Sequence, residues 1–310
     1  LTLAVLTLID RVAVWHVLVL AFLLGITHAF GLPARHSFIA QLVPKGDLPN
    51  AIALHSTVFN SARFLGPTLA GWVVLAADEG VVFALNALSY GVFLVLVSRI
   101  PAVHQPPPGA GSAWGRMREG LGHAWRDRGI RSVLFLIALA GFLGSPYVVL
   151  MPVFADEVFA GGPETLGLLV GAAGAGSLAG ALMLAQRADA GNLDRILGGA
   201  GVAAGIGLLA FSALDSRWLA FMVLPVVGFS LTTLGAGGNT LIQLLVPDAL
   251  RGRVVSLFSV TFLGLAPLGN LLSGSLAEVL GVQTTVALLG GLCLAGALAY
   301  LGLAPRAEPA

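Results

Sequence analysis

The stretch from Asn50 to Asp78 constrains the fold of this chain more than any other part of the sequence. It is largely apolar, and as a helix with a rise of ~1.5 Å per residue it would extend about 42 Å. The hydrocarbon core of a membrane is about 30 Å thick, so this stretch could cross it and reach both interfaces. An ordinary core helix of a soluble domain does not need this length. The stretch therefore predicts a transmembrane helix.

The composition of the whole chain agrees with that prediction. Hydrophobic residues make up 57% of the 310 residues and charged residues only 10%, which is typical of a membrane protein. The net charge of +1 gives no reason to expect a nucleic-acid partner. Cys293 is the only cysteine in the sequence, so the chain can form no internal disulfide and has no zinc-binding spacing. We expect the lipid bilayer as a partner and no metal or other cofactor.

Further apolar stretches recur along the chain and predict an all-α protein that crosses the membrane many times. Leu1–Ile9 is too short to span, which predicts the end of a helix that starts before Leu1. A tight turn is expected at Asp78–Gly80. Gly171–Gly180 is rich in glycine, which favours close helix packing in lipid. The predicted spans are Trp15–Pro33, Asn50–Ala77, Val81–Ser98, Ser132–Phe154, Leu166–Ala185, Ile196–Leu214, Trp218–Leu245, Val254–Val279 and Thr284–Leu303.

The basic residues fall on one side of this predicted topology. If the polar loop Arg35–Pro49 is cytoplasmic, alternation of the spans places thirteen of the sixteen Lys and Arg residues on the same side. The turns on the opposite side are mainly acidic. Because cytoplasmic loops of membrane proteins are enriched in Lys and Arg, the asymmetry predicts a cytoplasmic C-terminus.

The longest polar segment, residues 99–131, predicts a cytoplasmic linker. It contains three consecutive prolines, which cannot be helical throughout. Beyond them, apolar residues recur at three- and four-residue steps with arginines between them: Trp114, Met117, Leu121 and Trp125, with Arg116, Arg118, Arg126 and Arg128. This pattern predicts either an amphipathic helix with a basic face on an anionic membrane surface or a solvated linker.

The two parts of the chain on either side of this linker resemble one another weakly. Gln41–Pro44 reads QLVP and Leu244–Pro247 reads LLVP, while Pro67 is matched by Pro267. The spacing of about 200 residues fits two parallel six-helix halves related by an axis along the membrane normal. The predicted division is 1–98 for part of an N-terminal half, 99–131 for the linker and 132–310 for a C-terminal half. On this repeat, about 70 residues of the first half precede Leu1.

Small residues on one face of the Asn50–Asp78 helix would let a neighbouring helix approach closely. Their order resembles the antiporter motif on the fifth helix of major facilitator superfamily exporters, with alanine in place of three of its glycines. The positions that match the motif are Ala53, Ala62, Gly66, Pro67, Ala70 and Gly71.

Two longer strings carry the rest of the resemblance. They are LPARHSFIAQLVPKGDLPNAIALHSTVFNSARFLGPTLAG in the first half and LLVPDALRGRVVSLFSV in the second. Both are similar to the branch of the superfamily that contains the enterobactin exporter and the secretion-effector permeases. The resemblance implies the major facilitator fold, with about nine and a half of its twelve helices present. It also implies a proton-coupled exporter of a drug-like or siderophore-like molecule, acting by alternating access in the bacterial inner membrane.

Arg63 is the first candidate for a functional residue, because a charge in the middle of a span costs roughly 2.5–3.5 kcal/mol on insertion scales. It could contact the substrate or take part in coupling, or it could be a structural residue bonded to helix-end carbonyls or to Asn60. His28 lies within the Trp15–Pro33 span. Its imidazole could carry a proton or could be a packed, hydrogen-bonded core residue.

Uncharged polar residues within the spans could line a substrate cavity or bond neighbouring helices. They are Asn86, Tyr90, Tyr147, Asn239, Gln243 and Asn270. In the cytoplasmic loops, charged residues could latch the halves in one state or could simply be solvated and set the topology. They are Asp248, Arg251 and Arg253, together with Arg187 and Asp189, which loosely match the loop signature of the resembled superfamily.

Three kinds of function remain to be compared. A secondary transporter with a small-molecule substrate, and protons as the coupling ion implied by the resemblance, fits all of these features. A membrane enzyme would need a nucleophile with its base, a metal set or a carboxylate pair within the spans, and the sequence offers none of these. A non-transporting or partner-dependent membrane fragment is the remaining alternative.

Overall fold

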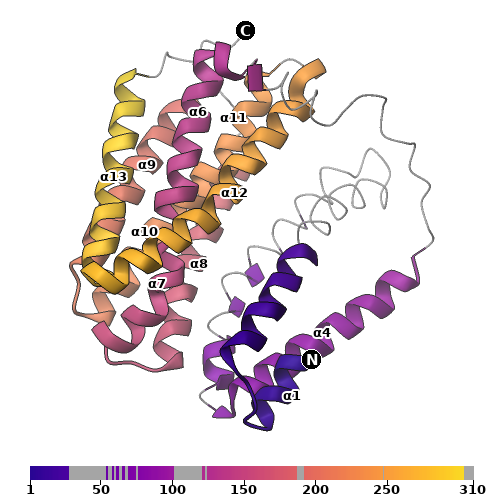
Figure 1. The fold of residues 1–310 in the computed structure, drawn as a ribbon. Helices are drawn as coiled ribbons and strands as arrows, with labels where there is room; N and C mark the ends of the chain where they lie inside the picture. The colour runs from indigo at the N-terminus through magenta and orange to yellow at the C-terminus, as the bar shows by residue number, and fades with distance from the viewer. Residues whose placement is uncertain are drawn as a thin grey trace. The chain divides into compact units, whose positions relative to one another are not determined.

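A computed structural model describes residues 1–27, 76–100, 124–186, 192–246 and 248–303, along with scattered positions from 54 to 74 and residues 121–122. Contacts divide the chain into two compact units. The first comprises Leu1–Phe59 and Leu69–Pro108, and the second comprises Asn60–Thr68 and Gly109–Ala310. Figure 1 shows both units as helices joined by turns.

The first unit contains α1 (Thr2–Leu8), a helix at Val14–Thr27 and α4 (Glu79–Ser98). α1 packs against the start of α4, where a Cβ atom on Gly80 would lie only 2.7 Å from Cγ of Leu8. A tight connection occurs where a turn was predicted at Asp78–Gly80, but it lies at residues 77–78, because α4 already begins at Glu79. The side chain of Asp78 caps this helix by accepting a hydrogen bond of 2.6 Å from the backbone N–H of Gly80.

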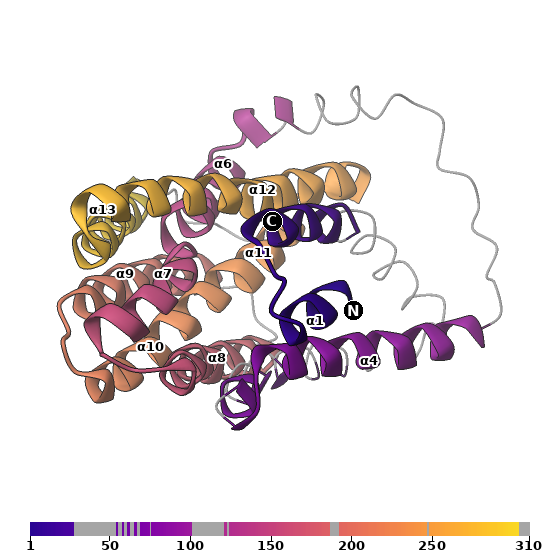
Figure 2. The same cartoon turned by 60° about the horizontal axis from the view of Figure 1, so that its bottom comes forward.

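The second unit is a bundle of long helices that run side by side (Figures 1 and 2). Two of its spans, Arg128–Val158 and Arg217–Leu245, are assembled from several helical segments, while the others are continuous. The elements are α6 (Arg128–Leu139), η1 (Ala140–Gly144), α7 (Tyr147–Val153), η2 (Phe154–Val158), α8 (Pro163–Ala185), α9 (Leu193–Ser212), α10 (Arg217–Thr232), η4 (Thr233–Gly237), α11 (Gly238–Leu245), α12 (Asp248–Leu280) and α13 (Val282–Leu303).

Within the described residues, seven helices are long and apolar enough to cross a membrane. They are Glu79–Ser98, Arg128–Val158, Pro163–Ala185, Leu193–Ser212, Arg217–Leu245, Arg253–Leu280 and Val282–Gly302. Each corresponds to one of the predicted spans, and the ends agree within four residues. The predicted all-α membrane architecture is confirmed for this part of the chain. Residues 15–27 of the predicted Trp15–Pro33 span lie in the apolar Val14–Thr27 helix, and its remaining residues are outside the described part. The Asn50–Ala77 span is described only at scattered positions.

Two of these spans contain segments of π-helix, which the sequence patterns did not predict. The segments η1 and η2 flank α7 in the first span, and η4 joins α10 to α11 in the other. A π-helical turn holds an extra residue and leaves the regular α-helical hydrogen bonding locally interrupted. The span that begins at Arg128 also contains Pro146 and Pro152, neither of which can donate a backbone hydrogen bond.

Helices α8 and α10 approach each other so closely that their backbones touch. A Cβ atom on Gly176 would clash with the carbonyl oxygen of Pro225, and one on Gly228 would clash with that of Ala173. Helices α9 and α13 meet in the same way, since a Cβ atom on Gly205 would lie 2.6 Å from Cβ of Leu294. Close crossings at small residues are the usual packing mode of membrane helices, as the glycine-rich sequence predicted.

Apolar side chains fill the interior of the second unit in two main clusters. One cluster lies between α6, α9, α11, α12 and α13 and includes Ile137, Leu197 and Ile242. The other lies around α7, η2, α8, α9 and α10, where the rings of Phe154 and Phe211 are 4.4 Å apart between centroids. At the end of the bundle, Gly281 adopts a φ of 81° and makes the single-residue connection between α12 and α13.

The end of the linker differs from its predicted form. Leu121 and Trp125 are helical, but Asp127 interrupts the helix and Arg128 belongs to α6. The reason is local, because the Asp127 side chain accepts a hydrogen bond of 2.9 Å from the backbone N–H of Ile130 and starts a new helix. Arg128 is therefore the first residue of a membrane span and no part of an amphipathic linker helix.

Candidate functional site

Polar atoms without partners are concentrated along the span that contains η4. The hydroxyls of Ser230 and Thr233 are buried, as is Oδ1 of Asn239, and none has a hydrogen-bond partner among the described residues. Ser230 and Thr233 are both 0% exposed. A buried polar group without a partner costs about 1–3 kcal/mol, so three in one helix mark a site that is incomplete as it stands.

Thr233 lies at the seam between η4 and α8. Its hydroxyl oxygen is 3.2 Å from the position that a Cβ atom on Gly180 would take, so the glycine leaves the space in which this hydroxyl sits. On the same face of α8, the buried Ser177 hydroxyl is within hydrogen-bond distance of the carbonyl oxygens of Ala173 and Gly228, at 3.1 and 3.2 Å. Ser177 is thus satisfied by backbone, whereas Thr233 is not.

A fourth unpartnered atom lies on α12. Oδ1 of Asn270 is buried and has no hydrogen-bond partner within the described part of the chain. The neighbouring Gly269 faces the π-helical segment η1, where a Cβ atom would clash with the carbonyl oxygen of Phe142. α12 also packs against both α7 and α11. The helix that carries Asn270 therefore adjoins the helices that carry Tyr147 and Asn239.

The structure places the other predicted polar residues in different surroundings. Tyr147 is buried at the start of α7, and Gln243 is half-buried on α11. Both side chains belong to residues that have interaction partners. Asn86 and Tyr90 lie on exposed positions of α4 in the first unit. Four of the six predicted residues are therefore carried by adjoining helices of one unit.

The motif and loop predictions are only partly covered. Of the antiporter-like positions, Ala62 and Gly66 are helical and exposed, Ala70 is half-buried and Gly71 is buried. Arg253 is half-buried on α12 and has an interaction partner. The remaining candidates lie outside the described residues, or have side chains that do: Arg63, Asn60, His28, Ala53, Pro67, Arg187, Asp189, Asp248 and Arg251.

Sequence reasoning missed Ser230 and Thr233. Single hydroxyl residues are common in membrane helices because they can bond to the backbone one turn earlier, so they carry little signal by themselves. The available signal was the run from Ser230 to Thr233 followed by glycines at 235, 237 and 238, which places polar groups at a point of weakened helix. No group of His, Cys, Asp and Glu that could hold a metal ion occurs within the described residues.

Comparison with known proteins decides the family. The family model described as transmembrane secretion effector matches residues 1–308. The chain belongs to this family of the major facilitator superfamily. The predicted membership is confirmed. The family is one of transporters, which favours the transporter over the membrane enzyme considered as an alternative. This protein is thus a multi-pass membrane protein.

Two curated relatives of this protein have names that describe transport. The staphyloferrin A transporter of Staphylococcus aureus is 23% identical over 274 residues, which is 88% of this chain and 68% of the relative. The multidrug efflux pump Tap of Mycolicibacterium fortuitum is 25% identical over 292 residues, covering 91% of this chain and 71% of the pump.

A solved structure supports the same fold for this chain. It is the inward-facing, unoccupied form of a bacterial homologue of the human lysosomal transporter Spinster. The match has a TM-score of 0.58 at 17% identity and covers 90% of this chain and 76% of that one. At this identity the likeness concerns the fold alone, which is the predicted major facilitator fold.

Proposed function

We propose that this protein is an exporter that moves a small molecule across the bacterial inner membrane by alternating access, driven by protons. The proposal combines the transporter family with the polar run of Ser230, Thr233 and Asn239 inside an otherwise apolar span. An orphaned acceptor in a membrane helix persists when a ligand or a passing substrate completes its hydrogen bonding. This run is the observation that carries the proposed site.

The chemistry of the run favours a substrate that forms hydrogen bonds with uncharged groups of the protein. The unpartnered atoms of the run are two hydroxyls and one amide oxygen, and the amide oxygen of Asn270 on α12 is a fourth, so these groups select by hydrogen-bond geometry and not by charge. A substrate with hydroxyl or amine donors on an apolar body fits such groups. The printed names of the relatives, a staphyloferrin A transporter and a multidrug efflux pump, support a siderophore-like or drug-like molecule of this kind.

Proton coupling rests on the family. The acidic side chains on the described spans lie toward helix ends and not in their middles: Glu79, Asp156, Glu157, Glu164, Asp194 and Glu278. We therefore place the coupling group in the part of the protein that the structure does not describe, with Arg63 and His28 as candidates. We also retain a cytoplasmic C-terminus and the division into 1–98, 99–131 and 132–310 as part of this proposal.

An efflux assay in cells that express the full-length protein tests the proposed site. Asn239→Leu and Asn270→Leu each remove one of the unpartnered amides, so we expect roughly five- to tenfold slower efflux of a substrate that bonds to it. Ethidium and a catecholate siderophore serve as two chemically different probes. Thr240→Val is the matched control, because Thr240 is the neighbour of Asn239, is exposed and already donates to the carbonyl oxygen of Ala236 at 3.1 Å.

Two results would contradict the proposal. Equal slowing by Thr240→Val and Asn239→Leu would remove the assigned site. If neither probe is exported by cells with verified expression of the wild-type protein, the result would favour the non-transporting alternative. For the coupling ion, a protonophore such as carbonyl cyanide m-chlorophenylhydrazone should stop efflux by collapsing the proton-motive force, and efflux that continues in its presence would exclude protons.

A further inference from the structure

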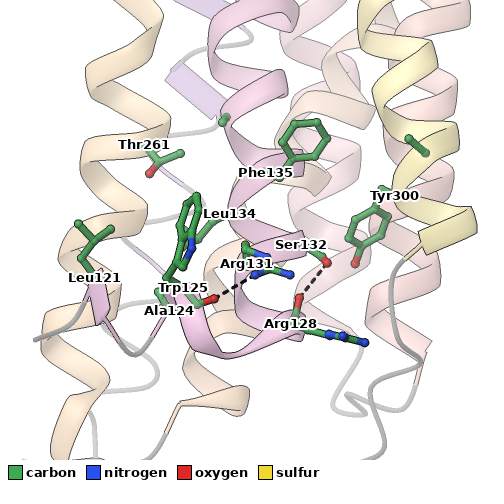
Figure 3. A pocket seen from close by; sticks show the side chains of 12 residues that line it. Leu121, Ala124, Trp125, Arg128, Arg131, Ser132, Leu134, Phe135, Thr261 and Tyr300 are labelled. Atoms are coloured by element: carbon green, nitrogen blue, oxygen red, sulfur yellow. Dashed lines mark hydrogen bonds between the residues drawn. The ribbon is translucent and has the colours of Figure 1, made fainter.

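A cavity of about 680 Å³ lies at the start of α6, and none of the predicted substrate residues lines it. Figure 3 shows it from close by, with Trp125 and Arg131 beside one another, Phe135 farther along α6 and Tyr300 reaching in from α13. The lining residues are Leu121, Ala124, Trp125, Arg128, Arg131, Ser132, Leu134, Phe135, Ala138, Thr261, Ala299 and Tyr300.

The charge at the entrance of the cavity is wholly basic. Arg128 and Arg131 are both exposed, and no acidic residue contributes to the lining. The nearby Asp127 is occupied as the cap of α6. Among the described residues, no carboxylate forms an ion pair with either arginine. Two guanidinium groups that form no ion pair within the described part of the chain therefore face one cavity.

Arg131 is held in position by Trp125, which lies shortly before the start of α6. Its Nη1 donates a hydrogen bond of 3.1 Å to the carbonyl oxygen of Trp125, and its Cζ lies 5.9 Å from the centroid of the Trp125 ring. This contact uses one of the five N–H donors of the guanidinium. The other donors remain available to an anion, and the exposed indole of Trp125 has the character of a residue at a membrane interface.

Beyond the two arginines the lining is mostly apolar, with the hydroxyl groups of Ser132, Thr261 and Tyr300 among it, and it follows α6. Phe135 and Ala138 continue the face of the helix on which the two arginines lie, with Ala299 of α13 in the opposite wall. The ten residue-to-residue steps from Arg128 to Ala138 correspond to about 15 Å along a helix. That is half of the ~30 Å hydrocarbon core of a bilayer. A groove of this length, basic at one end and apolar beyond it, matches one leaflet.

We propose that this groove is a binding site for an anionic phospholipid. The phosphate lies between Arg128 and Arg131, and an acyl chain lies along Phe135 and Ala138. The charge complementarity accounts for the head group, and the apolar extension accounts for a chain, which inorganic phosphate lacks. The site is separate from the proposed transport pathway and does not depend on it.

Retention of lipid by the purified full-length protein tests the proposal. The protein is placed in phosphatidylcholine nanodiscs that contain a minor fraction of phosphatidylglycerol, and bound lipid is counted by native mass spectrometry after release. For Arg128→Gln and Arg131→Gln we expect about fivefold weaker retention of phosphatidylglycerol for each arginine removed. Retention of phosphatidylcholine should not change.

Arg126→Gln is the matched control, because Arg126 is an exposed arginine next to Trp125 that does not line the cavity. If it reduces retention as much as Arg128→Gln does, only the general surface charge attracts the lipid and the site is refuted. Displacement of phosphatidylglycerol by inorganic phosphate would instead identify a free-anion site and also overturn the proposal.

A second variant tests the acyl-chain part with both arginines intact. Ala138→Trp should fill the apolar end of the groove and lower phosphatidylglycerol retention several-fold, while unchanged retention would exclude a chain at this position. Thermal unfolding of each variant in detergent confirms that it is folded. Because the substituted arginines are exposed, their variants should keep the wild-type unfolding temperature.

Discussion

At the scale of single residues, the molecule contains two buried threonines with opposite hydrogen bonding. Thr233 and Thr285 are both 0% exposed. The Thr285 hydroxyl donates a bond of 2.8 Å to the carbonyl oxygen of Gly281, whereas the Thr233 hydroxyl has no partner among the described residues. Identical substitutions at these two positions therefore separate a structural hydroxyl from one that is available to a ligand.

We expect Thr233→Val to leave thermal stability unchanged or to raise it, since the isosteric valine removes an unsatisfied hydroxyl. Thr285→Val should lower stability by about 1 kcal/mol, because it removes a hydrogen bond that is made. Thermal unfolding in detergent measures both. In the efflux assay the order reverses, with Thr233→Val the slower variant. Destabilisation by Thr233→Val without a loss of efflux would show that Thr233 is only structural.

The residues of the candidate site could be predicted in part. Asn239 and Asn270 stand out in the sequence because a polar amide within an apolar span needs a hydrogen-bond partner, either a substrate or a neighbouring helix. The hydroxyls at 230 and 233 do not stand out, because whether a hydroxyl is satisfied depends on the backbone geometry of its own turn. At Thr233 that geometry is the start of a π-helical segment, which no pattern of residue types specified.

At the scale of helices, the close crossing of α8 and α10 depends on the absence of a side chain at Gly176. A Cβ atom there would meet the carbonyl oxygen of Pro225, and a backbone atom cannot move aside as a side-chain end can. Gly176→Ala should therefore lower stability by about 1–3 kcal/mol through overpacking. Gly199→Ala is the control, because a Cβ atom on Gly199 meets nothing within 4 Å.

Thermal unfolding of these two variants in one detergent provides the measurement. Gly199→Ala should be neutral or stabilising by up to ~1 kcal/mol, since alanine favours a helix more than glycine does. Equal stability of Gly176→Ala and the wild-type protein would mean that α8 and α10 can separate at no cost. The close crossing would then have no structural importance.

The helices themselves were largely predictable, and their interruptions were not. The ends of the spans agree with the sequence because a span ends where apolar residues give way to polar ones, which is a compositional signal. The start of α4 was misplaced because a single capping aspartate, Asp78, begins the helix earlier than hydropathy indicates. The π-helical segments depend on tertiary packing around them, so local composition could not predict them.

At the scale of the whole molecule, the arrangement of charges predicts which ends of the spans face the cytoplasm. Arg126, Arg128 and Arg131 lie at one end of the first span of the second unit, and Asp156 and Glu157 lie at the other. Cys293 is buried, and Cys293→Ser gives a background without thiols. In that background we expect Ala160→Cys to react with an impermeant maleimide in intact cells.

The opposite end supplies the control for this experiment. Arg126→Cys should react only after the membrane has been made permeable, because the basic end of the span is expected on the cytoplasmic side. Both positions are exposed, so accessibility to the reagent depends on the membrane alone. Labelling of Arg126→Cys in intact cells, with Ala160→Cys protected, would reverse the predicted orientation of the entire chain.

The backbone contacts of α8 with α10 and of α9 with α13 determine how the second unit can move. Packed helices usually slide past one another by small rotamer changes of the side chains between them. At Gly176, Gly228 and Gly205 the neighbouring helix approaches with its backbone, so a slide would have to move backbone past backbone. We therefore expect α8 and α10 to be displaced together as one pair, and α9 and α13 as another. A transport cycle would place its flexibility at the boundaries of these pairs and in the segments that interrupt their helices.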